Sequence, residues 1–167
     1  KRLDDTSGLN YLAGVGVAFL TLVALNRELK ARNLNSELAE KVHGINLLNY
    51  LDLVALGTIC DTMPLVGLNR AFVATGLKVL GMRQNLGIST LMNIAGIKKP
   101  SVYAVGFGLG PRLNAAGRLD SASPALDLLL TENPLIANDL AGKFESERNR
   151  FFYKIEPESI YICGEFD

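Results

Sequence analysis

The sequence predicts a mainly α-helical chain with at most one or two short strands. Apolar residues recur at helical spacing in several segments, most clearly over residues 51–61. Helix-start signals, in which a capping residue is followed by proline, stand at Ser123-Pro124 and Asn133-Pro134. The tail over residues 156–164 changes character, and it either forms a short strand or is non-native sequence.

The first predicted helix runs to about Lys30, with Thr6 or Ser7 as its cap. Residues 8–26 carry no charge, which approaches the roughly 20 apolar residues that a membrane helix needs. The strongly apolar part is shorter and rich in Gly and Ala, so we expect a buried helix of a soluble protein. A membrane span remains the alternative for this segment. A short helix is expected to follow through Val42, and His43, the only histidine, is expected to be a loop or core residue.

Residues 51–61 predict a buried helix, with a strand as the alternative because of their Val and Leu content. Asp52 is expected to be a capping or first-turn residue. Asp61 ends the apolar run just before Thr-Met-Pro. A carboxylate at such a place either forms a turn or belongs to a site.

Further helices are predicted over residues 71–82, from Ser89 to about Ala95, from Ser123, and from Asn133 to about Lys154. In the last of these, apolar side chains are expected to form the core face: Leu135, Leu140, Phe144 and Phe151. The charged residues 145–150 are expected to lie on its solvated face.

Residues 105–118 combine four glycines with Pro111, Arg112, Asn114 and Arg118. The glycines and Pro111 predict a loop between helices. Guanidinium groups beside accessible backbone N–H groups suit a phosphate or a nucleic-acid backbone. A surface turn with two arginines is the alternative, because short glycine patterns are common.

Composition limits the choice of function. The 167 residues carry 17 basic and 17 acidic side chains, so any polyanion site must be local. The two cysteines, Cys60 and Cys163, fit no metal-ligand spacing and no disulfide framework, so reduced thiols in a cytosolic protein are expected. The chain begins without methionine and ends directly after an apolar cluster, so we expect a fragment of a longer protein.

Three motifs carry a resemblance to a known family. They are, in chain order, RLDDTS with LAGVGVAF, LDLVALGTICDTMPLVG with Asn69-Arg70, and GPRLNAAGRL at 110–119. The three resemble, in family order, signatures of RecJ, the single-strand-specific 5′-to-3′ exonucleases of the DHH phosphoesterase superfamily. The resemblance covers residues 1–150, and the tail after about Arg150 does not share it.

The resemblance implies a two-metal phosphodiesterase that uses Mn²⁺ or Mg²⁺. Asp61 matches the aspartate that the family's fourth motif supplies as a metal ligand. The implied partner is single-stranded DNA, contacted at its phosphates by Arg112, Asn114 and Arg118 without sequence preference, with packing across an interdomain groove as their alternative role. A single-strand-binding protein is an implied partner of the longer protein, and the implied location is cytoplasmic.

The sequence departs from the family because it has no Asp-His-His triplet and lacks the earlier aspartate motifs. We therefore expect the chain alone to be inactive. The family fold is α/β, and the chain is expected to fall mostly after its parallel sheet. The expected division is 1–66 as the end of the catalytic domain, 67–150 as connecting helices and the start of a second domain, and 151–167 as an atypical tail. The alternatives are another DHH-superfamily phosphoesterase, acting on short oligonucleotides, cyclic dinucleotides or polyphosphate, and a non-catalytic helical nucleic-acid-binding piece.

Overall fold

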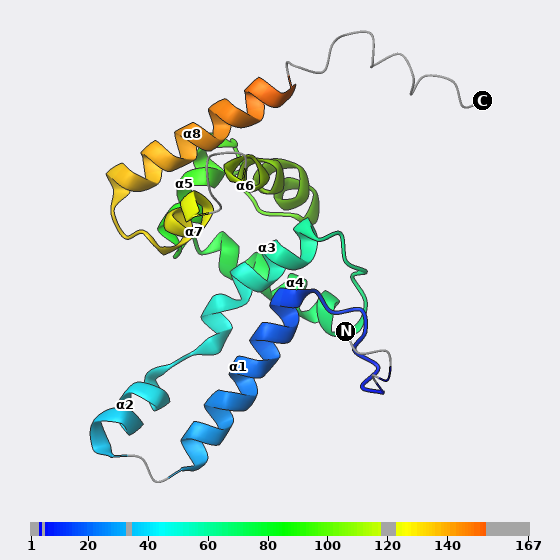
Figure 1. The fold of residues 1–167 in the computed structure, drawn as a ribbon, viewed down its shortest axis with the longest axis vertical. Helices are drawn as coiled ribbons and strands as arrows, with labels where there is room; N and C mark the ends of the chain where they lie inside the picture. The colour runs from blue at the N-terminus through cyan, green and yellow to red at the C-terminus, as the bar shows by residue number, and fades with distance from the viewer. Residues whose placement is uncertain (1–3, 5, 33–34, 118–122, 153–167) are drawn as a thin grey trace, which may run out of the picture. The chain divides into compact units, whose positions relative to one another are not determined.

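The computed structural model describes residues 4, 6–32, 35–117 and 123–152, and these contain helices and connecting segments without a strand (Figure 1). The prediction of a mainly helical chain is therefore confirmed for the described residues. The chain divides into two compact units, which are described separately. The first comprises Lys1–Gln84 with Lys99–Gly106, and the second comprises Asn85–Lys98 with Phe107–Asp167.

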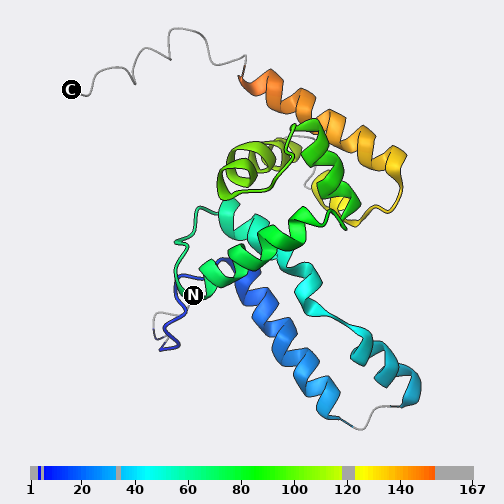
Figure 2. The same cartoon turned by 180° about the vertical axis from the view of Figure 1, so that it is seen from behind.

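The described residues of the first unit form α1 (Gly14–Ala31), α2 (Ser36–Gly44), the 3₁₀ turn η1 (Leu47–Tyr50), α3 (Leu51–Cys60) and α4 (Gly67–Gly81). The views from both sides show α2 running back alongside α1 (Figures 1 and 2). Helices α3 and α4 pack closely, because Gly76 brings the α4 backbone against the carbonyl oxygen of Leu51. The core around them includes Phe19 and Phe72, which meet edge to face with ring centroids 5.4 Å apart.

Helix α1 begins later than the sequence predicts. Its first residue is Gly14, and Ala13 occupies the cap position without a side-chain hydrogen bond. The predicted caps lie upstream, and the Ser7 hydroxyl instead accepts a hydrogen bond from the Leu9 amide. A short polar side chain can satisfy a local turn as readily as a helix end, which explains the error.

Within the described ranges, no single helix is long and apolar enough to cross a membrane. One bent pair, Ser36–Gly44 with Leu47–Cys60, meets that requirement by length and composition only, and most of α3 is buried inside the structure. The predicted helix at 51–61 is confirmed as α3, and the strand alternative for this segment is wrong.

The second unit contains α5 (Leu86–Ile94), α6 (Gly110–Ala116), α7 (Ser123–Leu130) and α8 (Pro134–Phe152). The start of α8 is as predicted, with the Asn133 side chain accepting a hydrogen bond from the Leu135 amide. Ser89 is not the cap of α5. Asn85 holds that position, because its Oδ1 accepts from the Ile88 amide at 2.9 Å while its Nδ2 donates to the Leu129 carbonyl at 2.9 Å.

The glycine-rich segment is helical, so the loop prediction for residues 105–117 is wrong. Residues Ala104–Leu109 form a π-helical turn, η2, which leads directly into α6. Pro111 lies in the first turn of α6, where a missing backbone N–H costs little, so it starts this helix rather than breaking one. A side chain at Gly108 would meet Ile97, which shows that this glycine serves close packing.

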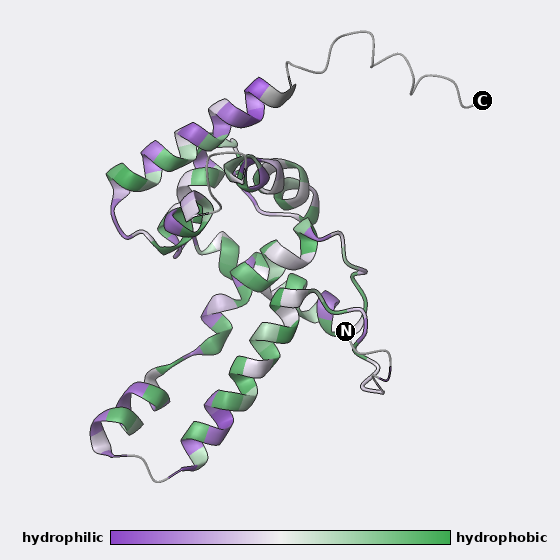
Figure 3. Cartoon of the chain, in the orientation of Figure 1, coloured by the Kyte–Doolittle hydropathy of each residue, from purple (hydrophilic) through white to green (hydrophobic). Residues whose placement is uncertain are grey.

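The buried face of α8 matches the predicted one in part. Phe144 is fully buried, as predicted, together with Ala137 and Ala141, whereas Leu135 is 80% exposed. Hydropathy also changes along α8, from apolar at its start to hydrophilic towards its end (Figure 3). The side chain of Phe151 lies outside the described residues.

Candidate metal and nucleic-acid site

Asp61 lies at the exposed C-terminal end of α3, as the sequence predicts for the end of the apolar helix. Its backbone belongs to a hydrogen-bonded helix ending, in which the Thr62 amide donates to Ile59 and the Met63 amide donates to Thr58. This pair of bonds is the Schellman ending of a helix. The carboxylate is therefore held at a defined helix terminus rather than on a free loop.

Thr62 follows Asp61 with φ at +52°, in the left-handed region where glycine is usual. A β-branched residue in this conformation is strained, at a cost of about 1–3 kcal/mol. The surrounding hydrogen bonds and packing must offset that strain. Strained backbone of this kind is common at functional sites, and here it directly follows Asp61.

A buried amide fastens the segment that follows Asp61. Asn69, with no exposed surface, donates from Nδ2 to the carbonyl oxygens of Tyr11 at 2.9 Å and Pro64 at 3.0 Å. The Tyr11 hydroxyl in turn accepts from the Leu68 amide at 3.2 Å. These bonds tie the segment before α1, the loop after α3 and the start of α4 together.

Two ionisable groups near this helix have displaced pKa values. Burial raises the pKa of Asp52, against the opposing effect of a hydrogen bond that its Oδ1 accepts from the Leu53 amide at 2.7 Å. Partial burial raises the pKa of the Cys60 thiol, and the negative charge of Asp61 raises it further. Both shifts oppose metal binding, since a thiolate or carboxylate must be ionised to bind a cation.

The metal-ligating side chains of the described residues do not form a divalent-metal site. Within residues 4, 6–32, 35–117 and 123–152, no three His, Cys, Asp or Glu side chains gather closely enough to hold an ion. His43, the single histidine, lies exposed on α2 with its ring Nδ1 2.7 Å from the Ala39 carbonyl oxygen. Asp61 is thus one candidate ligand, and a single carboxylate is too few to hold two metal ions.

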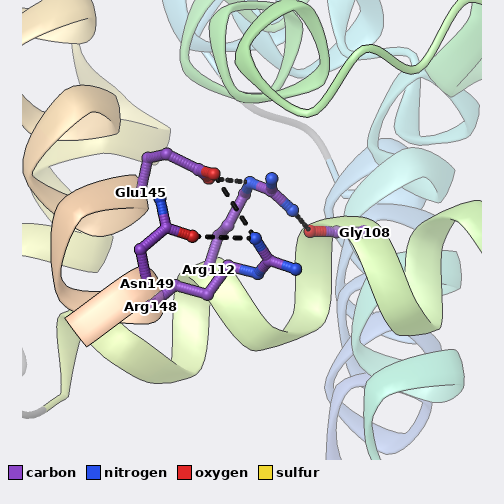
Figure 4. Close-up of polar contacts among 5 residues, drawn as sticks. All are labelled: Gly108, Arg112, Glu145, Arg148 and Asn149. Carbon is purple, nitrogen blue, oxygen red and sulfur yellow. Dashed lines mark hydrogen bonds and ion pairs between the residues drawn. The ribbon is translucent and has the colours of Figure 1, made fainter. Parts of the chain in front are cut away.

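Arg112 is buried in α6, with a residue exposure of 6%. Its Nη1 donates to the Gly108 carbonyl oxygen at 2.6 Å, and its Nε lies 2.5 Å from Oε2 of Glu145 on α8 (Figure 4). The latter contact lacks hydrogen-bond geometry, so it is an ion pair. Glu145 also pairs with Arg148 at 3.4 Å, and Arg148 donates to Asn149 at 3.1 Å.

The other predicted nucleic-acid contacts differ from Arg112 in position. Asn114 is exposed on α6, and because two residues of an α-helix are separated by about 200°, it lies nearly opposite Arg112. Arg118 lies outside the described residues. Of the three predicted residues, the structure therefore shows one facing outward and one facing the protein interior.

Sequence reasoning misses two residues of these arrangements. Glu145 is expected on a solvated face, yet its side chain is only 25% exposed and contacts two arginines. Asn69 enters only as part of a motif. Helical or strand spacing cannot predict either contact, because the partners are far apart in the sequence. Glu145 lies 33 positions after Arg112, and Asn69 lies 58 positions after Tyr11.

Curated proteins similar to this chain are RecJ proteins. It is 37% identical over 164 residues to the single-stranded-DNA-specific exonuclease RecJ of Dickeya dadantii, covering 93% of this chain and 28% of that protein. It is 38% identical over 165 residues to RecJ of Bacillus subtilis, covering 96% of this chain and 19% of that protein. The chain thus spans under a third of the length of these relatives. No family model matches it.

Solved structures give the same result. An exonuclease RecJ bound to manganese matches 88% of this chain and 36% of its own length, with a TM-score of 0.68 and 34% identity. RecJ of Thermus thermophilus in complex with Mn²⁺ matches 91% of this chain and 21% of its own length, with a TM-score of 0.69 and 33% identity. This chain is therefore homologous to a segment of the RecJ single-stranded-DNA-specific exonucleases.

Proposed function

We propose that this chain contributes part of a metal-dependent exonuclease that hydrolyses phosphodiester bonds in single-stranded DNA, with a role in DNA repair and recombination. The observation that carries the proposal is the 37% identity, over 93% of the chain, to a protein named as such an exonuclease. The chain also contains the aspartate-ending helix and the Gly-Pro-Arg-Leu-Asn segment that carry the resemblance to RecJ.

In this proposal Asp61 is one ligand of a site for Mn²⁺ or Mg²⁺. Two such ions would activate water and stabilise the charge of the scissile phosphate. The exposed position of Asp61 at the end of α3 supports the assignment, because a carboxylate there can meet ligands from another part of a longer protein. The chain's own contribution is to hold this carboxylate at a rigid helix end.

The proposed strand contacts are Asn114, from the exposed face of α6, and Arg118. An amide and a guanidinium group can donate hydrogen bonds to phosphate oxygens, which gives binding without sequence preference. The sequence predicts that Arg112 joins them. Its burial beside Glu145 supports a packing role within the second unit, rather than the alternative of packing across an interdomain groove.

Three further proposals follow from the same homology. The longer protein would have the α/β fold of DHH phosphoesterases, with residues 1–66 ending its catalytic domain and 67–150 leading into a second domain. In the present chain α4 packs on α3 within the first unit. A single-strand-binding protein would be its partner, and its location would be the cytoplasm.

A chimera tests the proposal. In it, this chain replaces the stretch of Bacillus subtilis RecJ that it matches. We expect the folded chimera to release nucleotides from 5′-phosphorylated single-stranded DNA in Mn²⁺, and the 167-residue chain alone to release none. A folded chimera without nuclease activity would sink the proposal and favour another phosphoesterase or a non-catalytic helical piece. Nucleotide release by the isolated chain would contradict the expectation that it lacks most of the ligands.

A further inference from the structure

Glu145 is the shared anion of a partly buried ion cluster that joins α8 to α6. Its two carboxylate oxygens pair with different guanidinium groups, Oε2 with Arg112 and Oε1 with Arg148. Arg112 extends the connection to the backbone, since it also donates to the carbonyl oxygen of Gly108 in η2 (Figure 4). One side chain of α6 is thus fixed both to α8 and to the turn that precedes α6.

The Arg112–Glu145 pair differs from the exposed Lys143–Asp139 pair of α8. Lys143 and Asp139 meet at 2.7 Å, but their side chains are 57% and 60% exposed. Such exposed pairs contribute little to stability because water screens them. Arg112 and Glu145 have side-chain exposures of 7% and 25%, so loss of the Glu145 charge would leave the Arg112 guanidinium group buried without its carboxylate partner. The position of α6 therefore depends on Glu145 far more than on Asp139.

We propose that Glu145 is a positioning residue for single-strand binding, which acts by fixing Arg112 inside the unit. With Arg112 held inward, the rotation of α6 is set, and Asn114 is presented on the opposite, exposed face. This inference rests on the proposed function and deepens it. In it, Arg112 and Glu145 orient α6, and outward-facing groups such as Asn114 contact the phosphates.

The competing possibility is that Arg112 binds a phosphate itself. Its guanidinium group would then have to leave Glu145, and the carboxylate would act as a competitor of the DNA. The two possibilities predict opposite effects of neutralising Glu145. A positioning role predicts weaker strand binding, whereas direct contact predicts tighter binding with a steeper salt dependence, because one more cation becomes available.

The first arm compares Glu145→Gln with Asp139→Asn in the 167-residue chain. Each change removes one negative charge from α8, so the effect of net charge on DNA binding is the same in both variants. Binding is measured by fluorescence anisotropy with 5′-phosphorylated oligo(dT) over a range of salt concentrations. We expect Glu145→Gln to weaken binding about tenfold relative to Asp139→Asn, with an unchanged salt slope. Tighter binding with a steeper slope would overturn the proposal.

The second arm removes both charges at once in Arg112→Met/Glu145→Leu. Apolar side chains of similar volume often replace a buried ion pair without loss of stability. We expect this double variant to recover the affinity lost in Glu145→Gln, again with an unchanged salt slope. If affinity stays low and the slope flattens by about one phosphate contact, Arg112 is a phosphate ligand and the proposal fails.

The third arm does not depend on DNA. Amide hydrogen exchange over residues 110–116 is expected to be faster in Glu145→Gln than in Asp139→Asn, because α6 loses its fixed partner. Unchanged exchange there would overturn the positioning role. If the unaltered chain does not bind the oligonucleotide, the proposed strand contacts fail, and the exchange measurement still decides whether Glu145 positions α6.

Discussion

Asn69, in the first turn of α4, donates a 3.0 Å hydrogen bond to the carbonyl oxygen of Pro64, which lies three positions after Asp61. The same amide nitrogen donates to the Tyr11 carbonyl oxygen, and Asn69 has no exposed surface. The loop that follows the candidate metal ligand is thereby tied to two other segments of its unit. The position of Asp61 depends on a buried amide as well as on the end of α3.

Replacing Asn69 with alanine is expected to lower the free energy of unfolding by about 1–3 kcal/mol, because two partly buried hydrogen bonds lose their shared donor. Asn138 offers a matched control, since its side chain also donates to a proline carbonyl, that of Pro134, but is exposed. Asn138→Ala should cost roughly 0.5 kcal/mol or less. Urea denaturation followed by circular dichroism measures both, and equal losses would contradict the role given to Asn69.

Replacing Thr62 with glycine should stabilise the chain by roughly 0.5–1 kcal/mol, because the strain at φ +52° is relieved. This gain exceeds the extra entropy that glycine brings to the unfolded chain. Met63→Gly is the control, because φ at Met63 is not positive, and it should destabilise the chain. Thermal unfolding of the two variants gives the comparison. A destabilised Thr62→Gly would show that the threonine side chain contributes more than its backbone costs.

Two glycines within helices should respond to alanine in opposite directions. A Cβ at Gly76 would collide with the Leu51 carbonyl oxygen and lie 2.5 Å from the Ala55 Cβ, so Gly76→Ala should destabilise by about 1–3 kcal/mol or more. At Gly142 in α8 a Cβ meets nothing within 4 Å, so Gly142→Ala should stabilise by about 0.5–1 kcal/mol. Denaturant midpoints that shift in the same direction would refute the close packing of α3 on α4.

Asp52 should make stability depend on pH. Burial raises its pKa in the folded chain above the ordinary 3.8, so the folded state favours the protonated form. That contribution is fully present below pH 3.8 and is lost as the pH rises through the higher folded pKa. Asp52→Asn should therefore be more stable than the parent at neutral pH, and this difference should shrink in acid. Asp127→Asn, the same change at an exposed position on α7, is the control. Parallel pH profiles for all three proteins would contradict the assignment.

Sequence alone predicts the elements whose cause is local. Apolar spacing locates α3, and the Asn133-Pro134 pair locates the start of α8. The loop prediction for the glycine-rich segment is wrong because it rests on the glycine and proline content and not on where these residues lie in the fold. Four glycines and a proline suggest a loop, but Pro111 fits the first helical turn, and Gly108 is needed where Ile97 approaches.

The candidate site is also predictable only where its cause is local. The position of Asp61 at the end of an apolar helix can be read from neighbouring residues. The burial of Arg112 cannot, because it depends on a carboxylate from another helix. Charge patterns within α8 suggest a solvated face, and only the packing of α6 against α8 brings Glu145 to Arg112.

The central claim is that Asp61 supplies one metal ligand to a single-strand exonuclease. The most direct test is the rate of nucleotide release from single-stranded DNA, in Mn²⁺, by the chimera described above with and without the change Asp61→Asn. This change keeps the side-chain shape and removes the charge, and Asp127→Asn is the control. We expect Asp61→Asn to lower the rate by at least about 100-fold while the control retains it, because even residues behind a metal ligand affect activity by about 10–100-fold. Equal rates for the unaltered chimera and its Asp61→Asn variant would contradict the claim.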